Sequence, residues 1–201
     1  MASTVLHRIN QSPGIGLLAV FEAQKQGAEH SPPPITAPPE TAGEVKALCD
    51  SFTLASFTAE DAWELGHLLY ARLLPFAAQG RPTVISIALA NSGQVVFQAA
   101  VGAGTAPDNE TWVARKRATV LRWGCSTWLL RCKYGADEEL FRSKFALGPD
   151  QGGCYAIHGG GVPIRVRGVE GVVAVVVVSG LNQREDHGVI VEVINSNWAP
   201  Q

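Results

Sequence analysis

The chain has 201 residues, 46% of them hydrophobic, and a formal net charge of −2 at pH 7. This length is most simply one domain with appendages, and a chain this apolar can bury a sizeable core. The slightly acidic balance argues against a nucleic-acid partner, because proteins that bind nucleic acid are usually clearly basic. No apolar run approaches the roughly 20 residues of a membrane-spanning helix, so no membrane span is expected.

Residues 1–43 are predicted to form an N-terminal extension that precedes the main domain, residues 44–201. The extension contains a short amphipathic stretch, residues 15–26, and a segment from Gly27 to Gly43 that carries five prolines and few large apolar side chains. Such a segment buries too little surface to offset its ordering entropy, which indicates a flexible or extended linker.

The N-terminus and the cysteines bear on the compartment. The first residues contain neither a strongly basic region nor a small-residue cleavage site, but they are poor in acidic residues. We therefore expect a cytoplasmic protein and leave a mitochondrial presequence open. The four cysteines form no CxxC pair and show no zinc-binding spacing, which favours reduced thiols.

The first elements of the main domain are predicted to be a helix and a β-hairpin. Thr58 is the expected N-cap of the helix, apolar residues recur every three or four positions, and Gly80 ends it. Residues 83–90 and 94–101 then form two strands. The turn between them, Asn91–Gly93, places glycine where a positive φ is needed.

A second helix is expected to begin at Asp108 or Asn109 and to end at Gly124. It carries Arg115 and Lys116, followed by a third basic residue. Three consecutive helical residues spread over about 200° and cannot all address one ligand. The basic residues could form a solvated face, or Arg115 or Lys116 could stand beside Asn109 in a wall that faces an anion.

The remaining elements complete an α+β domain. Residues 137–145 have a helical pattern, residues 162–167 and 172–178 read as strands joined by a turn, and a last helix runs from Asn182 to about Trp198. Residues 172–178 are apolar at nearly every position. This pattern indicates a strand buried on both sides, with helices on both faces of the sheet.

Three consecutive glycines, Gly159 to Gly161, follow His158 and precede a predicted strand. The glycines allow backbone conformations that other residues avoid and let another group approach the main chain. They could form a wide turn or bulge. Alternatively, they could floor a pocket in which backbone N–H groups and His158 meet a ligand. A nucleotide loop is excluded because a strand, not a helix, follows.

The last predicted helix opens with a group of polar residues. Asn182 and Glu185 have capping-box spacing, and Asp186 suits the positive end of the helix dipole. His187 has no such explanation. It could be a packed or capping residue, or a ligand to a bound group.

Four motifs in this order resemble those of the haem-degrading-domain family, in its fungal and bacterial branch of largely uncharacterised cytoplasmic proteins. They are DAWELG, TAPDNETWVARKR, HGGGVPI and VSGLNQREDHGVIVE, and the similarity spans residues 44–198. The resemblance implies a profilin-like α/β/α sandwich around an antiparallel sheet of about five strands, and homo-oligomeric assembly. Relatives in a sister branch bind haem or iron.

The resemblance also implies a ligand site. Transferred motif by motif, its residues are Asn109, Trp112, Arg115, Lys116, His158, Gly159, Gly160, Gly161, Glu185, Asp186 and His187. Met1 is the only methionine, so a bound haem would take His158, His187 or a cysteine as axial ligand, or bind without strong ligation. No catalytic constellation is identified, and the residues do not support an enzyme assignment.

Two functions are consistent with these features. The first is an oligomeric module that binds a small anionic ligand, haem or a related compound, near the HGGG segment. The second is a non-catalytic homo-oligomeric adaptor for cytosolic protein partners such as chaperone or targeting factors. The adaptor would use tryptophans at its interfaces, and the candidates are Trp112, Trp123, Trp128 and Trp198.

Overall fold

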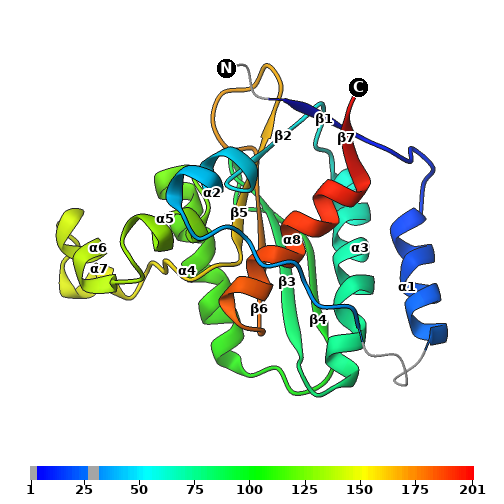
Figure 1. Ribbon diagram of the computed structural model, residues 1–201, viewed down its shortest axis with the longest axis horizontal. Helices are drawn as coiled ribbons and strands as arrows, with labels where there is room; N and C mark the ends of the chain where they lie inside the picture. Colours follow the sequence, from blue (N-terminus) through cyan, green and yellow to red (C-terminus); the bar gives the residue numbers. More distant parts are fainter. Residues whose placement is uncertain (1–3, 27–31) are drawn as a thin grey trace.

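The computed structural model describes residues 4–26 and 32–201, and it is a three-layer α/β/α sandwich (Figure 1). The strands are β1 (Val5–Arg8), β2 (Phe52–Leu54), β3 (Thr83–Leu89), β4 (Val95–Val101), β5 (Gly161–Val166), β6 (Ala174–Ser179) and β7 (Trp198–Pro200). The helices are α1 (Ile15–Gln26), α2 (Ala42–Leu48), α3 (Ala59–Ala78), α4 (Pro107–Trp123), α5 (Thr127–Lys133), α6 (Glu138–Lys144), α7 (Pro149–Gly152) and α8 (Gln183–Asn197).

The seven strands form one mostly antiparallel sheet in the order β4-β3-β6-β5-β2-β1-β7. The two predicted hairpins, β3-β4 and β5-β6, are antiparallel as expected, and Gly93 turns the first with φ 69°. β6 lies between β3 and β5, and all its residues are buried. Side chains of α3 and α8 pack on one face of the sheet. Val113 and Val120 of α4 pack on the other, which confirms the predicted helices on both faces.

The sheet has seven strands where the resemblance implies about five, and β1, β2 and β7 are the three that the sequence did not predict. β2 continues the sheet beside β5 in parallel, and β1 then pairs in parallel with β2 and antiparallel with β7. Each has only three or four residues, too few for a period of two to stand out in the sequence. β1 belongs to the predicted extension, so this extension contributes a strand to the sheet.

Residues 32–39 of the proline-rich segment form neither helix nor strand and pack on the domain, and its last two residues, Ala42 and Gly43, begin α2. The guanidinium of Arg72 donates to the Pro33 carbonyl at 2.9 Å, and the indole of Trp128 donates to the Pro39 carbonyl at 2.7 Å. A Cβ on Gly188 of α8 would lie 2.4 Å from the Thr36 carbonyl oxygen. Side chains distant in the sequence thus hold the proline-rich segment on the domain through its carbonyl groups. The composition of the segment does not reveal these contacts. Residues 27–31 of the predicted linker lie outside the described residues.

Local capping signals locate most helix ends. Thr58 caps α3 in a capping box with Asp61, and Asn182 caps α8, both as predicted. The predicted start of α4 was wrong, because its N-cap is Ala106. Pro107 occupies the first helical position, where its missing N–H costs nothing. Asn109 is therefore not the N-cap residue but lies in the first turn of α4, where its side-chain oxygen accepts a hydrogen bond from the Ala106 N–H at 2.7 Å.

Replacing Thr58 with alanine removes the acceptor for the Asp61 N–H, which lies 3.2 Å from the hydroxyl oxygen. We expect Thr58→Ala to lower the free energy of unfolding by about 1 kcal/mol. Chemical denaturation measures the loss. Thr111→Ala, an exposed substitution within α4, is the matched control and should change stability little. Equal losses in the two variants would contradict the role of the cap.

Candidate functional site

A pocket of about 520 Å³ lies where the N-termini of α4 and α8 meet, beyond the end of β6. Its lining comes from the start of α4, from the HGGG segment, and from the link between β6 and α8. The lining residues are Ala106, Asp108, Asn109, Trp112, Lys116, His158, Ser179, Gly180, Leu181, Asn182, Gln183 and Asp186. The structure thus brings five of the predicted site residues together: Asn109, Trp112, Lys116, His158 and Asp186.

A buried ion pair forms one wall of the pocket. The Lys116 ammonium, on a residue only 2% exposed, donates to the Asp186 carboxylate and to the Val178 carbonyl, each at 2.9 Å. The other oxygen of Asp186 accepts from the Leu181 N–H at 3.0 Å. Burial raises the pKa of Asp186, while Lys116 and the hydrogen bonds oppose this shift. The pair joins α4 to α8 across the end of β6.

The three consecutive basic residues of α4, Arg115 to Arg117, do not form a solvated face. Arg115 donates twice to the Tyr155 carbonyl, at 3.1 and 2.9 Å, and its guanidinium carbon lies 4.5 Å from the centre of the Trp112 ring. Arg117 donates to the Ser86 hydroxyl at 2.5 Å. With Lys116 turned inward, the three consecutive residues have three separate environments. Arg115 is not among the residues that line the pocket, and it holds Trp112 in place.

His158 lies on the rim of the pocket with its side chain 38% exposed. Its ring meets the ring of Trp112 at a centroid distance of 4.8 Å, and its Nδ1 lies 3.3 Å from a carboxylate oxygen of Glu138. Burial lowers the pKa of His158, Glu138 opposes this, and Lys116 and Arg115 lower it further. The lowered pKa favours the neutral imidazole, in which one ring nitrogen can accept a proton or bind a metal ion.

Gly159, Gly160 and Gly161 are all buried. A Cβ on Gly159 would lie 2.2 Å from the Gln183 carbonyl oxygen, and one on Gly160 would lie 2.4 Å from that of Val178. The Gly161 N–H donates to the Thr127 hydroxyl at 3.0 Å. The glycines thus let the chain pass tightly beside β6 and α8. This differs from the expectation of exposed N–H groups on a pocket floor.

The other two predicted residues of α8 lie outside the pocket. Glu185 completes the capping box with Asn182 and pairs with Arg81 at 2.5 Å. His187 is fully buried, and its Nε2 lies 3.1 Å from the Cys49 carbonyl oxygen. Burial lowers the pKa of His187 to about 3, with the Cys49 hydrogen bond opposing. His187 therefore has the packed role that the sequence left open.

Sequence reasoning missed several lining residues, including Ser179, Leu181 and Gln183. Ser179 and Leu181 fall between the predicted strand 172–178 and the helix that begins at Asn182, and Gln183 falls in the first turn of that helix, so nothing in the local sequence marks them as pocket residues. The sequence did predict both helix N-termini that border the pocket. A helix N-terminus is favourable to anions because its first N–H groups are unpaired, so these two positions were the available signal for a ligand site. Glu138 was also missed, because its contact with His158 joins segments that are distant in sequence.

The part of the chain that the structure describes offers few options for a metal. Residues 4–26 and 32–201 contain no group of three or more His, Cys, Asp or Glu side chains that could hold an ion. None of the described helices is long and apolar enough to cross a bilayer.

The fold and the pocket define the chain as an α/β/α sandwich protein with a ligand-sized cavity at paired helix N-termini. The family model described as "Haem degrading protein HbpS-like" matches residues 57–195. The chain belongs to this family. The matched residues include the whole pocket lining, and they begin after α1, β1 and β2.

Curated relatives support the same assignment. A UPF0303 protein of Streptomyces avermitilis is 41% identical over 158 residues, which cover 79% of this chain and 91% of the relative. The UPF0303 protein YBR137W of Saccharomyces cerevisiae is 34% identical over 134 residues, covering 67% of this chain and 71% of the relative.

Solved structures agree on the fold. The crystal structure of Ybr137w has a TM-score of 0.67 at 30% identity and covers 77% of this chain and 86% of its own. The crystal structure of HbpS has a TM-score of 0.50 at 19% identity and covers 70% and 89% respectively. The HbpS likeness supports the architecture alone.

Alanine at Gly160 tests the close packing beneath the ion pair. Gly160 and Gly168 both have positive φ, 110° and 80°, but no atom lies within 4 Å of a Cβ added at Gly168. We expect Gly168→Ala to cost about 1 kcal/mol from backbone strain, and Gly160→Ala at least twice as much because of steric overlap. Urea denaturation compares the two. Equal losses would contradict the close-packing account.

Acid titration of stability tests the environment of His187. Its folded pKa of about 3 lies below the ordinary value of 6.5, so protonation favours unfolding. Its contribution is complete above pH 6.5 and is lost as pH falls from 6.5 toward 3. His187→Gln should remove up to about 1.4 kcal/mol per pH unit from the slope of unfolding free energy against pH. His7→Gln is the control. An unchanged slope in His187→Gln would contradict the assignment.

Proposed function

We propose that this chain is a small-molecule-binding module whose pocket takes an anionic, planar ligand, with haem or a related compound as the specific candidate. The observation that carries the proposal is the position of the Lys116 ammonium, in a pocket between two helix N-termini. The family description supports haem as the first ligand to test. Nothing in the pocket requires catalysis, and we propose none.

The anionic part of the ligand follows from the electrostatics of the pocket. The first turns of α4 and α8 bring backbone N–H groups and the positive ends of two helix dipoles to the same cavity, together with the carboxylates of Asp108 and Asp186. An ammonium has three N–H donors. Val178 and Asp186 use two of those of Lys116, which leaves the third for a ligand. A carboxylate would satisfy this donor and offset the positive helix ends.

The planar part of the ligand follows from Trp112 and His158. The Trp112 indole donates to Asp108 at 2.8 Å and lies against the Arg115 guanidinium, so the ring is fixed before a ligand arrives. His158 meets its edge and presents a neutral imidazole. These residues fit haem, because the imidazole could ligate iron while Lys116 binds a propionate. Bound haem would supply redox chemistry at iron, and the chain's own residues would bind and orient the ring.

Hemin titration followed at the Soret band tests the proposal. We expect saturable binding by the wild type and at least tenfold weaker binding by His158→Ala, because the axial ligand is lost. His7→Ala, a histidine substitution on β1, is the matched control. Titration with iron-free protoporphyrin separates pocket binding from ligation and should show little difference between wild type and His158→Ala. Weak, non-saturating and identical hemin spectra for all three proteins would sink the haem proposal.

A homo-oligomeric adaptor is the second candidate, and an exposed tryptophan favours it. Among the tryptophans predicted at interfaces, Trp128 and Trp198 are only 2% and 3% exposed and belong to the core. Trp112 lies on the pocket, and Trp123 packs against Phe141, Phe145 and Tyr155 of its own chain. Trp63 of α3 is instead 49% exposed. Exposed aromatic residues are typical of interfaces, and protein partners such as chaperone or targeting factors remain part of this proposal.

A further inference from the structure

A second pocket, of about 490 Å³, lies at the other end of α4, beside the turns that join β3 to β4 and β5 to β6. We call it the arginine pocket, and its lining residues are Ala90, Asn91, Leu121, Arg122, Trp123, Gly124, Arg165, Gly171 and Val172. α4 has 17 residues, so at a rise of about 1.5 Å per residue the helix separates this pocket from the candidate ligand pocket by about 25 Å. The two pockets are therefore distinct sites.

The arginine pocket is positively charged. Arg122 and Arg165 supply two charges, and none of the described residues that line it is acidic. Among residues 4–26 and 32–201, no carboxylate forms an ion pair with either guanidinium. The candidate ligand pocket differs, because Asp108 and Asp186 line it together with Lys116. An anion that enters the arginine pocket meets positive charge with no carboxylate in the lining.

Two groups hold Arg165 from inside the protein. Its guanidinium donates to the Gly124 carbonyl at 2.7 Å, at the end of α4. Asp50 does not line the pocket, and its carboxylate accepts from the Ser126 N–H at 2.6 Å. Burial raises the pKa of Asp50, whereas Ser126, Lys133 and Arg165 lower it, so Arg165 acts on Asp50 through charge alone. Because a guanidinium has five N–H donors, Arg165 keeps donors for a ligand.

Arg122 is held by aromatic rings. Its guanidinium carbon lies 4.9 Å from the ring centres of Trp123 and Tyr155, and it donates to the Tyr155 hydroxyl at 2.8 Å. These contacts fix the plane of the guanidinium and use few of its donors. A planar fork held in place in this way matches the oxygens of a phosphate or a carboxylate.

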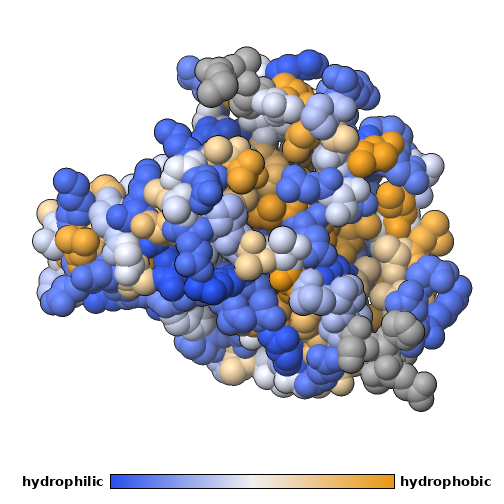
Figure 2. Space-filling view, viewed as in Figure 1, coloured by the Kyte–Doolittle hydropathy of each residue, from blue (hydrophilic) through white to orange (hydrophobic). Residues whose placement is uncertain are grey.

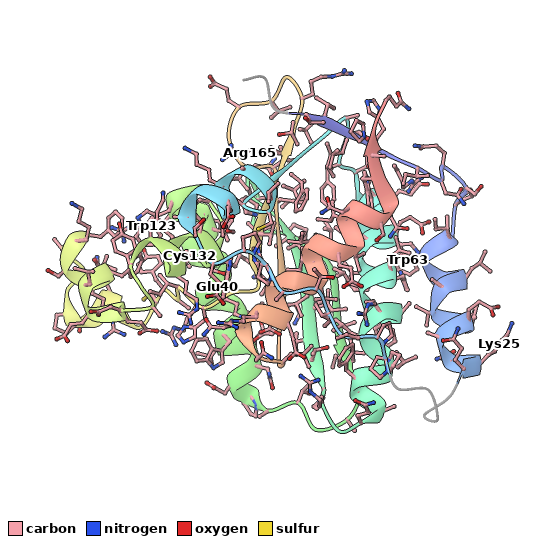
Figure 3. The ribbon with its side chains drawn as sticks, in the orientation of Figure 1. Lys25, Glu40, Trp63, Trp123, Cys132 and Arg165 are labelled. Carbon is pink, nitrogen blue, oxygen red and sulfur yellow. The ribbon has the colours of Figure 1, made fainter. Side chains whose placement is uncertain are left out.

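The arginine pocket lies away from the apolar surface of the molecule. Hydrophobic residues gather over α1, where Leu18 and Phe21 are exposed, whereas the side of α5 and α6 carries more hydrophilic residues (Figure 2). Trp123 packs against Phe141 of α6 on that side (Figure 3). Arg165 lies close to the link between β5 and β6 in the same view. A charged ligand can thus approach over polar surface.

We infer that the arginine pocket binds the phosphate monoester of a small molecule. Such a group carries a charge of about −1.5 to −2 at pH 7 and three acceptor oxygens, which matches two guanidiniums better than a single carboxylate does. The pocket is larger than one phosphate group, and Ala90, Leu121 and Val172 give it an apolar side for the organic part. This site goes beyond the proposed function and does not depend on haem binding.

Isothermal titration calorimetry with inorganic phosphate and with phenyl phosphate tests this inference. We expect saturable binding by the wild type, tighter for phenyl phosphate because the apolar side contributes. Arg122→Gln and Arg165→Gln should each weaken binding at least tenfold, because each loses charge-assisted hydrogen bonds. Arg167→Gln removes an exposed arginine just after β5 and outside the pocket lining, so this matched control should bind like the wild type.

The outcomes separate this site from general attraction of anions and from the haem proposal. Three results would overturn it: no saturable binding of either probe, equal weakening in Arg167→Gln, or binding that neither Arg122→Gln nor Arg165→Gln changes. Equal affinity for the two probes would overturn the monoester assignment. Circular dichroism confirms folding, and Arg165→Lys, which keeps the charge without the fork, should also bind more weakly if Arg165→Gln does not fold.

Hemin titration reads the two sites independently. Arg165→Gln should bind hemin like the wild type, because Arg165 is far from the candidate ligand pocket. Loss of hemin binding in every protein would therefore count against the haem proposal and leave the phosphate result standing.

Discussion

The ion pair between Lys116 and Asp186 fixes the geometry on which the pocket depends. Lys116 comes from the helix on one face of the sheet, Asp186 from a helix on the other, and the two meet past the end of β6. Burying two charges is costly unless their remaining hydrogen-bonding groups are satisfied. Here the Val178 carbonyl accepts a second bond from Lys116 and the Leu181 N–H donates to the other oxygen of Asp186, which leaves one N–H of the ammonium without a partner among these groups. The pair therefore sets the starts of α4 and α8 side by side.

The glycine run is a consequence of the same contact. A side chain on Gly160 would reach within 2.7 Å of the Lys116 ammonium nitrogen. The chain must therefore pass beneath the pair without a Cβ, and His158 emerges at the rim as it does so. Burial lowers the pKa of both His158 and His187, but the two imidazoles lie in different places. His158 keeps one side toward the cavity, whereas His187, on the helix that carries Asp186, turns into the core.

Sequence reasoning succeeded where the determining interactions are local. The caps at Thr58 and Asn182, the hairpin turn at Gly93 and the fully buried β6 all depend on residues within a few positions of one another. It failed where partners are distant. Lys116 and Asp186 are 70 positions apart, and neither residue type predicts burial by itself. The short strand β1 is likewise defined only by its neighbours β2 and β7.

The order of strands at the β2-β1-β7 end of the sheet also determines which strands dissociate together. β7 joins the sheet only through β1, so the last strand depends on the first for its hydrogen bonds. Proteolytic removal of β1 would free the C-terminal strand along with it, while β2 would keep its pairing with β5. The dependence runs one way, because β1 would keep its pairing with β2 if β7 were removed.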